Sequence, residues 1–481
     1  MKKRFIFITA RRKELRGGNM KKRRLMLCSL VSLIMVFVMA VPMTVSAAEV
    51  TVTTADQLKA EVAKGGDITL GADIEASIEI PKGVTVTLDL NGKKLTNEAK
   101  KDTITNNGTL TVKGNGTVDN VSHGKGALVN KGTATINGGT FTRSQEASKS
   151  PTDDGGNSWY VIRNQGTLTV NDGTVTNNSR FSSLVRNDGT MNINGGTFTN
   201  IFNTIKNDAT GTMIISAGTI TSDDQAVQNW SKLSVTGGIF NGEVYTWSYD
   251  EQGEQFAGET SIDGVAVVNG DVAAIRFGDA TTSKPTVEIK GGTVNGTVKK
   301  GEYGAAYVVV DPSAQSSDIT VSGGTFAKEP ASAFIPKDKI AIKYVEANSD
   351  GKYYVGTNEE IQEIANTAKD GDTIDVIKGS ITLDKIKPGV TVNNAESNEK
   401  GEVRVNGTTL EPGTGMKIQN PATDPTNPSQ DQTQKPSDTA KADKSAKTGD
   451  DFNLFAVGGV ALAAIIAMAA VAITGRRHRQ R

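Results

Sequence analysis

Eight segments of the chain repeat one alternation of apolar and polar residues. In each copy, apolar residues such as Leu168 and Val170 are separated by Thr, Asn, Ser or Lys, a period of two that predicts a strand with one buried face. The Asn-Gly-Gly or Asn-Asp-Gly that typically follows permits a sharp corner before a second short strand. The copies span residues 108–118, 132–141, 166–175, 189–198, 211–220, 231–240, 285–294 and 317–326. Each ends in an apolar residue that we expect to stack from copy to copy: Val118, Phe141, Val175, Phe198, Ile220, Phe240, Val294 and Phe326.

A third strand precedes each of the first six copies, where an apolar residue stands two places before an asparagine. These asparagines recur after 24, 34, 23, 20 and 22 residues. Three short strands and three corners in about 22 residues make one coil, with strands of successive coils about 4.8 Å apart. The sequence therefore predicts an all-β fold, a right-handed parallel β-helix. The recurring asparagines are Asn106, Asn130, Asn164, Asn187, Asn207 and Asn229.

Aligned asparagines at one corner of a coil can hydrogen-bond to one another, amide to amide, along the axis. Such bonds satisfy polar groups that the turn would otherwise bury without partners. We therefore expect a ladder formed by the six asparagine side chains. The alternative is that they are ordinary turn residues that face solvent.

Two short helices are predicted where a solenoid needs its open strand edge covered. Residues 54–63 have an amphipathic pattern that leads into strands over 66–90, and residues 358–368 lead in the same way into 371–392. The expected organisation is a signal peptide at 1–48, an N-terminal cap with the first coils at 49–100, β-helix repeats at 101–335, a small second β-helical unit or distal cap at 336–412, a disordered spacer that spans the cell wall at 413–447, and a sorting signal with a transmembrane helix and basic tail at 445–481.

The N-terminus has the pattern of a secretory signal peptide. A basic cluster at 21–24 precedes an apolar run over 25–41, and small residues follow. Signal peptidase accepts only small side chains next to its cleavage site, so we expect cleavage after Ala47 or Ala48. Met20 is the expected true start, because the residues directly before it have codons that can form a purine-rich ribosome-binding site.

The C-terminus combines an apolar segment with a basic tail. Phe452–Ile473 comprises 22 residues, enough to cross a bilayer as a helix, and four arginines follow it. Thr448-Gly449 before this segment resembles the sorting signal of sortase-anchored wall proteins, which implies cleavage between these residues and transfer of the Thr448 acyl group to the peptidoglycan precursor. Ser445 and Ala446 replace the usual Leu and Pro, so either a divergent sortase cleaves the chain or the helix stays as a membrane anchor.

Composition and charge exclude several classes of function. The only cysteine, Cys28, lies in the predicted signal peptide, so a mature chain has no disulfide, thiolate metal site or cysteine nucleophile. We expect neither a cofactor nor a metal ion. The chain has 53 basic and 53 acidic residues, and the segments 1–47 and 449–481 together contain 15 of the basic and 3 of the acidic ones. The rest of the chain therefore has a net charge of −12. An acidic exterior argues against nucleic acid as a partner.

The repeats over residues 50–330 resemble the pectate-lyase-like β-helix superfamily. That resemblance implies a polysaccharide lyase, a glycoside hydrolase or a non-catalytic adhesin, and fold alone does not choose among them. Asp223 and Asp224 are the nearest match to the paired carboxylates of a hydrolase, but no Gly-His-Gly or Arg-Ile-Lys motif accompanies them, and the alternative is that they are turn residues. Residues 153–157 carry oxygen ligands without the spacing of a calcium loop.

Positive residues recur on the strand that ends in the asparagine. Arg163, Arg186 and Lys206 should face outward in a column, with Asp188 and Asp208 neutralising part of the charge. The functional interpretation is an anion-contact groove for acidic sugars or phosphate-containing polymers. The alternative is a solvated ladder of charges.

Two insertions interrupt the repeats and carry aromatic residues. The first, 143–160, ends in Trp-Tyr, and the second, 243–262, contains Tyr245, Trp247 and Tyr249. Aromatic rings on loops bind sugars through the apolar face of a pyranose, but they also form the cores of loops. Both interpretations stay open at this point.

Three functions are compatible with these patterns. The first is a surface-displayed adhesin or glycan-binding module without catalytic activity, whose partners would be a host or dietary glycan and the cell-wall peptidoglycan. The second is a carbohydrate-active enzyme that acts on acidic polysaccharide. The third is a structural stalk of the cell wall that needs no ligand.

Overall fold

The computed structural model describes residues 49–144, 159–177, 182–251, 254–278, 284–304, 307–309 and 318–420. The predicted signal peptide with Met20, Ala47 and Ala48, the sorting residues Thr448 and Gly449, and the apolar segment Phe452–Ile473 lie outside these residues. Within the described part of the chain, no helix is both long and apolar enough to cross a membrane.

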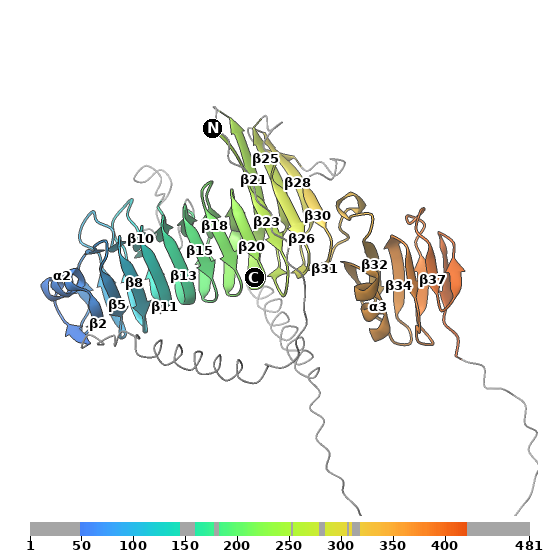
Figure 1. Cartoon of the computed structure of the whole chain (residues 1–481), viewed down its shortest axis with the longest axis horizontal. Helices are drawn as coiled ribbons and strands as arrows, with labels where there is room; N and C mark the ends of the chain where they lie inside the picture. The colour runs from blue at the N-terminus through green and yellow to red at the C-terminus, as the bar shows by residue number, and fades with distance from the viewer. Residues whose placement is uncertain are drawn as a thin grey trace, which may run out of the picture. The chain divides into compact units, whose positions relative to one another are not determined.

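Strands dominate the described residues, and most of them belong to one long sheet rich in parallel pairs (Figure 1). The sheet consists mainly of three parallel ladders, which we call ladders one, two and three; one strand from each makes one coil. This arrangement is compatible with a β-helix. Ladder one contains β4 (Ile78–Ile80), β7 (Ile104–Asn106), β10 (Leu128–Asn130), β12 (Ile162–Asn164), β14 (Val185–Asn187), β17 (Ile205–Asn207), the end of β19 (Thr219–Asn229), most of β21 (Ile239–Glu251), β25 (Val272–Gly278) and β28 (Val298–Gly304).

Ladders two and three complete each coil. Ladder two contains β1 (Val50–Val52), β2 (Gly66–Leu70), β5 (Thr85–Asp89), β8 (Thr109–Lys113), the first halves of β11 (Thr133–Thr142) and β13 (Thr167–Thr176), β15 (Thr190–Ile193), β18 (Thr212–Ile215), β20 (Lys232–Val235), β23 (Glu259–Ile262), β26 (Thr286–Ile289) and β30 (Ile319–Val321). Ladder three contains β3 (Ile74–Glu75), β6 (Lys93–Thr96), β9 (Gly116–Asp119), the second halves of β11 and β13, β16 (Thr197–Asn200), the starts of β19 and β21, β24 (Val267–Val268), β27 (Thr293–Val294) and β31 (Gly324–Phe326).

The core lies between the ladders and is built from columns of apolar side chains. In ladder three, Phe141 pairs in register with Val118 and Val175, and Val175 pairs with Phe198; all four are essentially unexposed. Burial of each such side chain contributes about 1.5–3 kcal/mol. The column also includes Val268, from a coil that the repeat pattern did not identify.

That coil corrects the prediction of a second insertion over residues 243–262. β21 runs through the predicted insertion as a strand of 13 residues, and β23 at its end is an ordinary member of ladder two. Strands β21, β25 and β28 extend beyond the neighbouring strands of ladder one (Figure 1). Because β22 (Glu254–Ala257) pairs antiparallel with the end of β21, the predicted loop is a hairpin that enlarges the sheet.

Glycines at the start of the repeats allow successive coils to approach closely. A Cβ atom added to Gly166 would lie 2.1 Å from the carbonyl oxygen of Gly132, and one added to Gly189 would lie 2.2 Å from the carbonyl oxygen of Gly166. These distances are far below a van der Waals contact. Gly166 and Gly189, which begin their repeats, are therefore required by the spacing of the coils.

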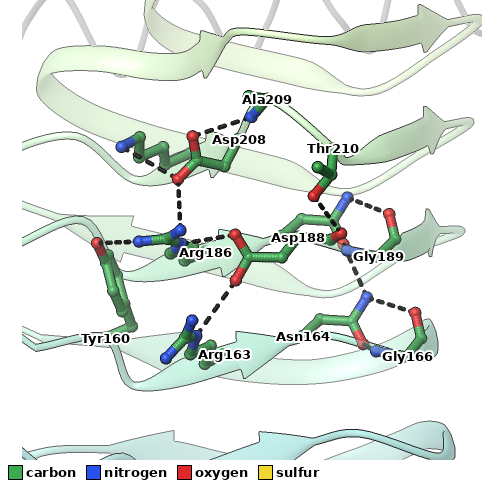
Figure 2. A network of polar contacts seen from close by, with 12 residues as sticks. Tyr160, Arg163, Asn164, Gly166, Arg186, Asp188, Gly189, Asp208, Ala209 and Thr210 are labelled. Carbon is green, nitrogen blue, oxygen red and sulfur yellow. Dashed lines mark hydrogen bonds and ion pairs between the residues drawn. The ribbon is translucent and has the colours of Figure 1, made fainter. Parts of the chain in front are cut away.

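The six asparagines of ladder one form a continuous buried ladder of side-chain hydrogen bonds, part of which is drawn around Asn164 in Figure 2. Each Nδ2 donates to the Oδ1 of the next asparagine at 2.7 or 2.8 Å, from Asn106 through Asn229. Every side chain is fully buried. Each Nδ2 also donates to backbone carbonyls, as Asn130 does to that of Thr167, so the ladder joins the corner of one coil to the next.

Helix α2 (Ala55–Lys64) lies at the N-terminal end of the stack (Figure 1). The Thr54 hydroxyl accepts a hydrogen bond from the Gln57 backbone N–H and caps the helix. Leu58 and Val62 are buried in the same core as the first strands. The helix begins one residue after the predicted start.

Residues 340–418 form a β unit with its own hydrophobic cluster. Strand β33 (Lys352–Gly356) pairs antiparallel with β31, and helix α3 (Asn358–Thr367) is closed by a capping box between Thr357 and Glu360. Strand β39 (Thr414–Lys417) lies in residues that were predicted to be spacer, so the spacer boundary at 413 is wrong. The remaining elements are η2 (Ser332–Phe334), β29 (Tyr307–Val309), β32 (Ile340–Val345), β34 (Thr373–Lys378), β35 (Ile381–Leu383), β36 (Thr391–Asn394), β37 (Val403–Val405), β38 (Thr408–Leu410) and β39 (Thr414–Lys417).

Replacement of one ladder asparagine should destabilise the fold strongly. Asn187→Ala leaves the Nδ2 of Asn164 and the Oδ1 of Asn207 buried without this partner, and we expect a loss of about 2–4 kcal/mol in the free energy of unfolding. Urea unfolding followed by circular dichroism measures it. The control is Asn194→Ala, which removes an exposed amide that bonds to Asn171 and should cost less than about 1 kcal/mol. If both variants lost the same free energy of unfolding, burial of the asparagine ladder would not be what stabilises the fold.

Candidate functional site

The positive residues of ladder one lie in register on consecutive coils. Arg163 pairs with Arg186, and Arg186 pairs with Lys206. Two aspartates stand between them, as Figure 2 shows: the Asp188 carboxylate accepts from Nε of Arg163 at 3.2 Å and from Nε of Arg186 at 2.8 Å. Asp208 lies 2.9 Å from Arg186 and 3.3 Å from Lys206. We call these five residues the charge ladder.

The charge ladder is largely neutralised by its own aspartates. Its cationic side chains are about one-quarter exposed, and each has a carboxylate partner within 3.3 Å. Arg186 also lies 5.7 Å from the ring centroid of Tyr160, a cation–π distance. This geometry favours a structural role and leaves one net positive charge for contact with an anion.

A cavity of about 480 Å³ opens on the next coils in the same direction. Lys206 pairs in register with Gln228, and Gln228 pairs with Tyr245, so the cavity lies where the column changes from charged to amide and aromatic side chains. We call it the aromatic pocket. Its lining residues are Phe202, Asn203, Asp224, Gln225, Gln228, Trp230, Glu243, Tyr245, Trp247 and Phe277.

The aromatic side chains of the pocket hold one another in place. Trp230 stacks on Trp247 with ring centroids 5.2 Å apart and planes 22° apart, and Tyr245 lies 6.4 Å from Trp247 at 56°. The indole N–H of Trp247 donates to Oε1 of Gln225 at 3.0 Å. Tyr245 and Trp247 are each 6% exposed, so other side chains cover most of this wall of the pocket.

The structure separates the three aromatic residues that were grouped as one candidate contact. Tyr245 and Trp247 line the pocket from strand β21, whereas Tyr249 lies farther along that strand and stacks between Phe256 and Phe277 at 5.2 and 5.4 Å. The expectation of aromatic residues on a loop is therefore wrong. They lie on strands, and Trp230 joins them from the position after Asn229.

Two carboxyl groups line the pocket, and they are not the pair predicted from the sequence. Asp224 of β19 lines it, but Asp223 is exposed and does not. The second carboxyl is that of Glu243 on β21, brought close because Gln225 pairs with Glu243 across a bulge. The irregular register explains why the repeat pattern did not identify Glu243.

Burial disfavours the charged form of both carboxyl groups. Burial raises the pKa of Asp224, and burial together with the nearby charges of Asp224 and Asp271 raises the pKa of Glu243, while hydrogen bonding to Tyr245 and the charge of Lys299 oppose this rise. Burial and the Glu243 carboxylate likewise raise the pKa of Tyr245. The pocket is thus a poorly solvated site that keeps two acidic groups near one another.

The remaining predicted chemistry does not add to this site. In the part of the chain that the structure describes, no group of three or more His, Cys, Asp or Glu could hold a metal ion. Residues 153–157, the suggested oxygen ligands, and most of the first insertion lie outside the described residues. Comparison with protein-family models, with curated proteins and with solved structures finds no significant match in any of the three.

The charge ladder should contribute modestly to stability, in a salt-dependent way. Asp188→Asn removes the negative charge that Arg163 and Arg186 share, and we expect a loss of about 1 kcal/mol in the free energy of unfolding at low ionic strength, which shrinks at about 1 M salt. Urea unfolding at the two salt concentrations measures the difference. Asp223→Asn, an exposed aspartate outside the ladder, should show no such salt-dependent loss, and a matching loss there would argue against the ladder.

Proposed function

We propose that the chain is a cell-surface protein whose right-handed parallel β-helix displays a glycan-binding site without catalytic activity. The observation that carries the proposal is the aromatic pocket, where ring faces, amides and carboxyl groups line one cavity. Binding sites of this kind combine an apolar wall with a few polar groups that fix the orientation of a ligand.

The lining residues match the two surfaces of a sugar. The apolar C–H face of a pyranose packs on an aromatic ring such as that of Trp230. Its hydroxyl groups hydrogen-bond to the Gln228 amide, which both donates and accepts, and to the Glu243 carboxylate, which accepts. The rings are fixed by their mutual stacking, so little side-chain freedom is lost when a ligand binds.

A carbohydrate-active enzyme is the second candidate, because Asp224 and Glu243 line the same cavity. Acid–base hydrolysis of a glycosidic bond uses two carboxyl groups in one site, one protonated through a raised pKa and one ionised. Burial raises the pKa of both Asp224 and Glu243, so either could be the acid. The acidic pair in this proposal is Asp224 with Glu243, in place of Asp223 with Asp224. A stalk without ligand is the third candidate.

Surface display in this proposal depends on the two ends of the chain. Signal peptidase would remove the N-terminal segment after Ala47 or Ala48, and a sortase would join Thr448 to peptidoglycan, or the segment Phe452–Ile473 would stay in the membrane. The similarity of Thr448-Gly449 and the segment after it to a sorting signal supports this part of the proposal.

Anchoring is tested by mass spectrometry of protein released from the cell wall with a muramidase. We expect a C-terminal peptide that ends at Thr448 and carries a cell-wall fragment. A peptide that continues past Gly449 would show that the chain is retained through its apolar segment, and recovery of the protein in the cytoplasm would contradict surface display.

Glycan binding is tested with the purified chain on a glycan array. Trp230→Ala should weaken binding of the glycans that the parent chain binds on the array by about tenfold or more, because a ring face is lost. The milder variant Gln228→Ala should weaken this binding less. Gln165→Ala, an exposed amide outside the pocket, is the matched control and should bind as the parent does.

Two outcomes would overturn the non-catalytic proposal. Release of new reducing ends from a bound glycan, abolished in Asp224→Asn, would assign the pocket to an enzyme. Absence of any glycan binding by a folded chain would favour the structural stalk.

A further inference from the structure

The charged side chains that line the aromatic pocket are all acidic. Its lining contains two acidic residues, Asp224 and Glu243, and no Lys, Arg or His. Lys299, which is not part of the lining, has its Nζ 2.5 Å from the Asp271 carboxylate. The pocket itself therefore has an excess of negative charge in a poorly solvated place.

Uncompensated carboxylates in such a place are unfavourable. Transfer of a charge out of water costs free energy unless an opposite charge or hydrogen bonds replace the lost hydration. Burial raises the pKa of Asp224 and of Glu243, which is the expected effect where this compensation is incomplete. A ligand with a positive charge would supply it and would favour the ionised carboxylates.

The aromatic lining also favours a cation. Five of the lining residues are aromatic: Phe202, Trp230, Tyr245, Trp247 and Phe277. The face of an aromatic ring attracts an ammonium group within about 6 Å of its centroid. The Tyr245 ring already does so, because Nζ of Lys299 lies 5.4 Å from its centroid.

One hydrogen-bond acceptor of the lining has no partner. Among the described residues, Oδ1 of Asn203 is buried without a hydrogen bond, and the whole residue is 4% exposed. One donor of the lining, Nε1 of Trp230, is likewise buried without a partner, and it calls for an acceptor such as a sugar hydroxyl. Buried polar atoms are normally paired, and an unpaired one in a cavity indicates a site for a donor. An ammonium group has three N–H donors and no acceptor, which fits an acceptor-only position.

We propose that the aromatic pocket binds the free ammonium group of an amino sugar. The group is held between aromatic faces, the carboxylates of Asp224 and Glu243, and the side-chain oxygen Oδ1 of Asn203. This inference rests on the proposed glycan-binding function and specifies the class of glycan. It distinguishes an amino sugar with an unmodified amine from the same sugar with an acetylated, neutral nitrogen.

The test is isothermal titration calorimetry of the purified chain with two probes of equal length. One is a glucosamine oligosaccharide with free amines, and the other is its fully N-acetylated form. We expect the amine form to bind about tenfold tighter or more. Glu243→Gln and Asp224→Asn should each reduce that preference, because they keep the shape of the side chain and remove its charge. Asp223→Asn, the exposed neighbour, should leave it unchanged.

The pH dependence gives a second readout. The amine form should lose affinity as the pH falls and the two carboxyl groups become protonated, and the loss should begin above the usual pKa range of a carboxyl group because both pKa values are raised. The groups that act on Glu243 are Tyr245, Lys299, Asp224 and Asp271. In Glu243→Gln this dependence should become shallower, whereas a merely structural role of Glu243 would leave its slope unchanged.

The outcomes separate this inference from the proposed function. If the acetylated form binds as tightly as the amine form and Trp230→Ala weakens both, the glycan-binding function stands and the ammonium assignment is overturned. If methylammonium alone binds as tightly as the amino sugar, the pocket recognises a simple cation and the sugar assignment is overturned. If no glycan of any kind binds, the proposed function and the inference both fail.

Discussion

The register between successive coils is the constraint on which the rest of this structure depends. Buried asparagines bond amide to amide only if each stands directly above the last, and the glycines before the strands allow the required approach. A shift of one residue would also turn every apolar side chain of a strand out of the core. The hydrogen-bonded corner and the packed interior therefore select the same alignment.

The place where the asparagine ladder ends is also the place where the surface changes. Asn229 donates to the hydroxyl of Thr260 at 2.9 Å, and Thr246 occupies its position on the next coil. From this coil onward, the strands of ladder one are long and carry aromatic residues. The regular stack thus acts as a rigid support, and the irregular coils beside it contain the cavity.

The pairing of charged side chains differs on the two sides of this boundary. In the charge ladder, cations and carboxylates alternate within 3.3 Å, so each charge has a partner of opposite sign inside the protein. In the aromatic pocket, two carboxyl groups are partly buried and no cation lines the same cavity. A site that must bind a partner leaves polar groups unsatisfied until the partner is present, and the pocket has this property.

The sequence by itself determined the regular part of the molecule. The period of about 22 residues, the alternation within each strand and the amphipathic pattern of the two helices are local patterns, so the columns of Phe141, Asn164 and Arg186 could be located without coordinates. Only the tertiary structure decided the site. Glu243 approaches Asp224 across a bulge between coils, and the aromatic residues of the supposed loop lie on an extended strand. Which residues become neighbours across an irregular register depends on the path of the chain in space. The spacing of residues along the sequence does not contain that information.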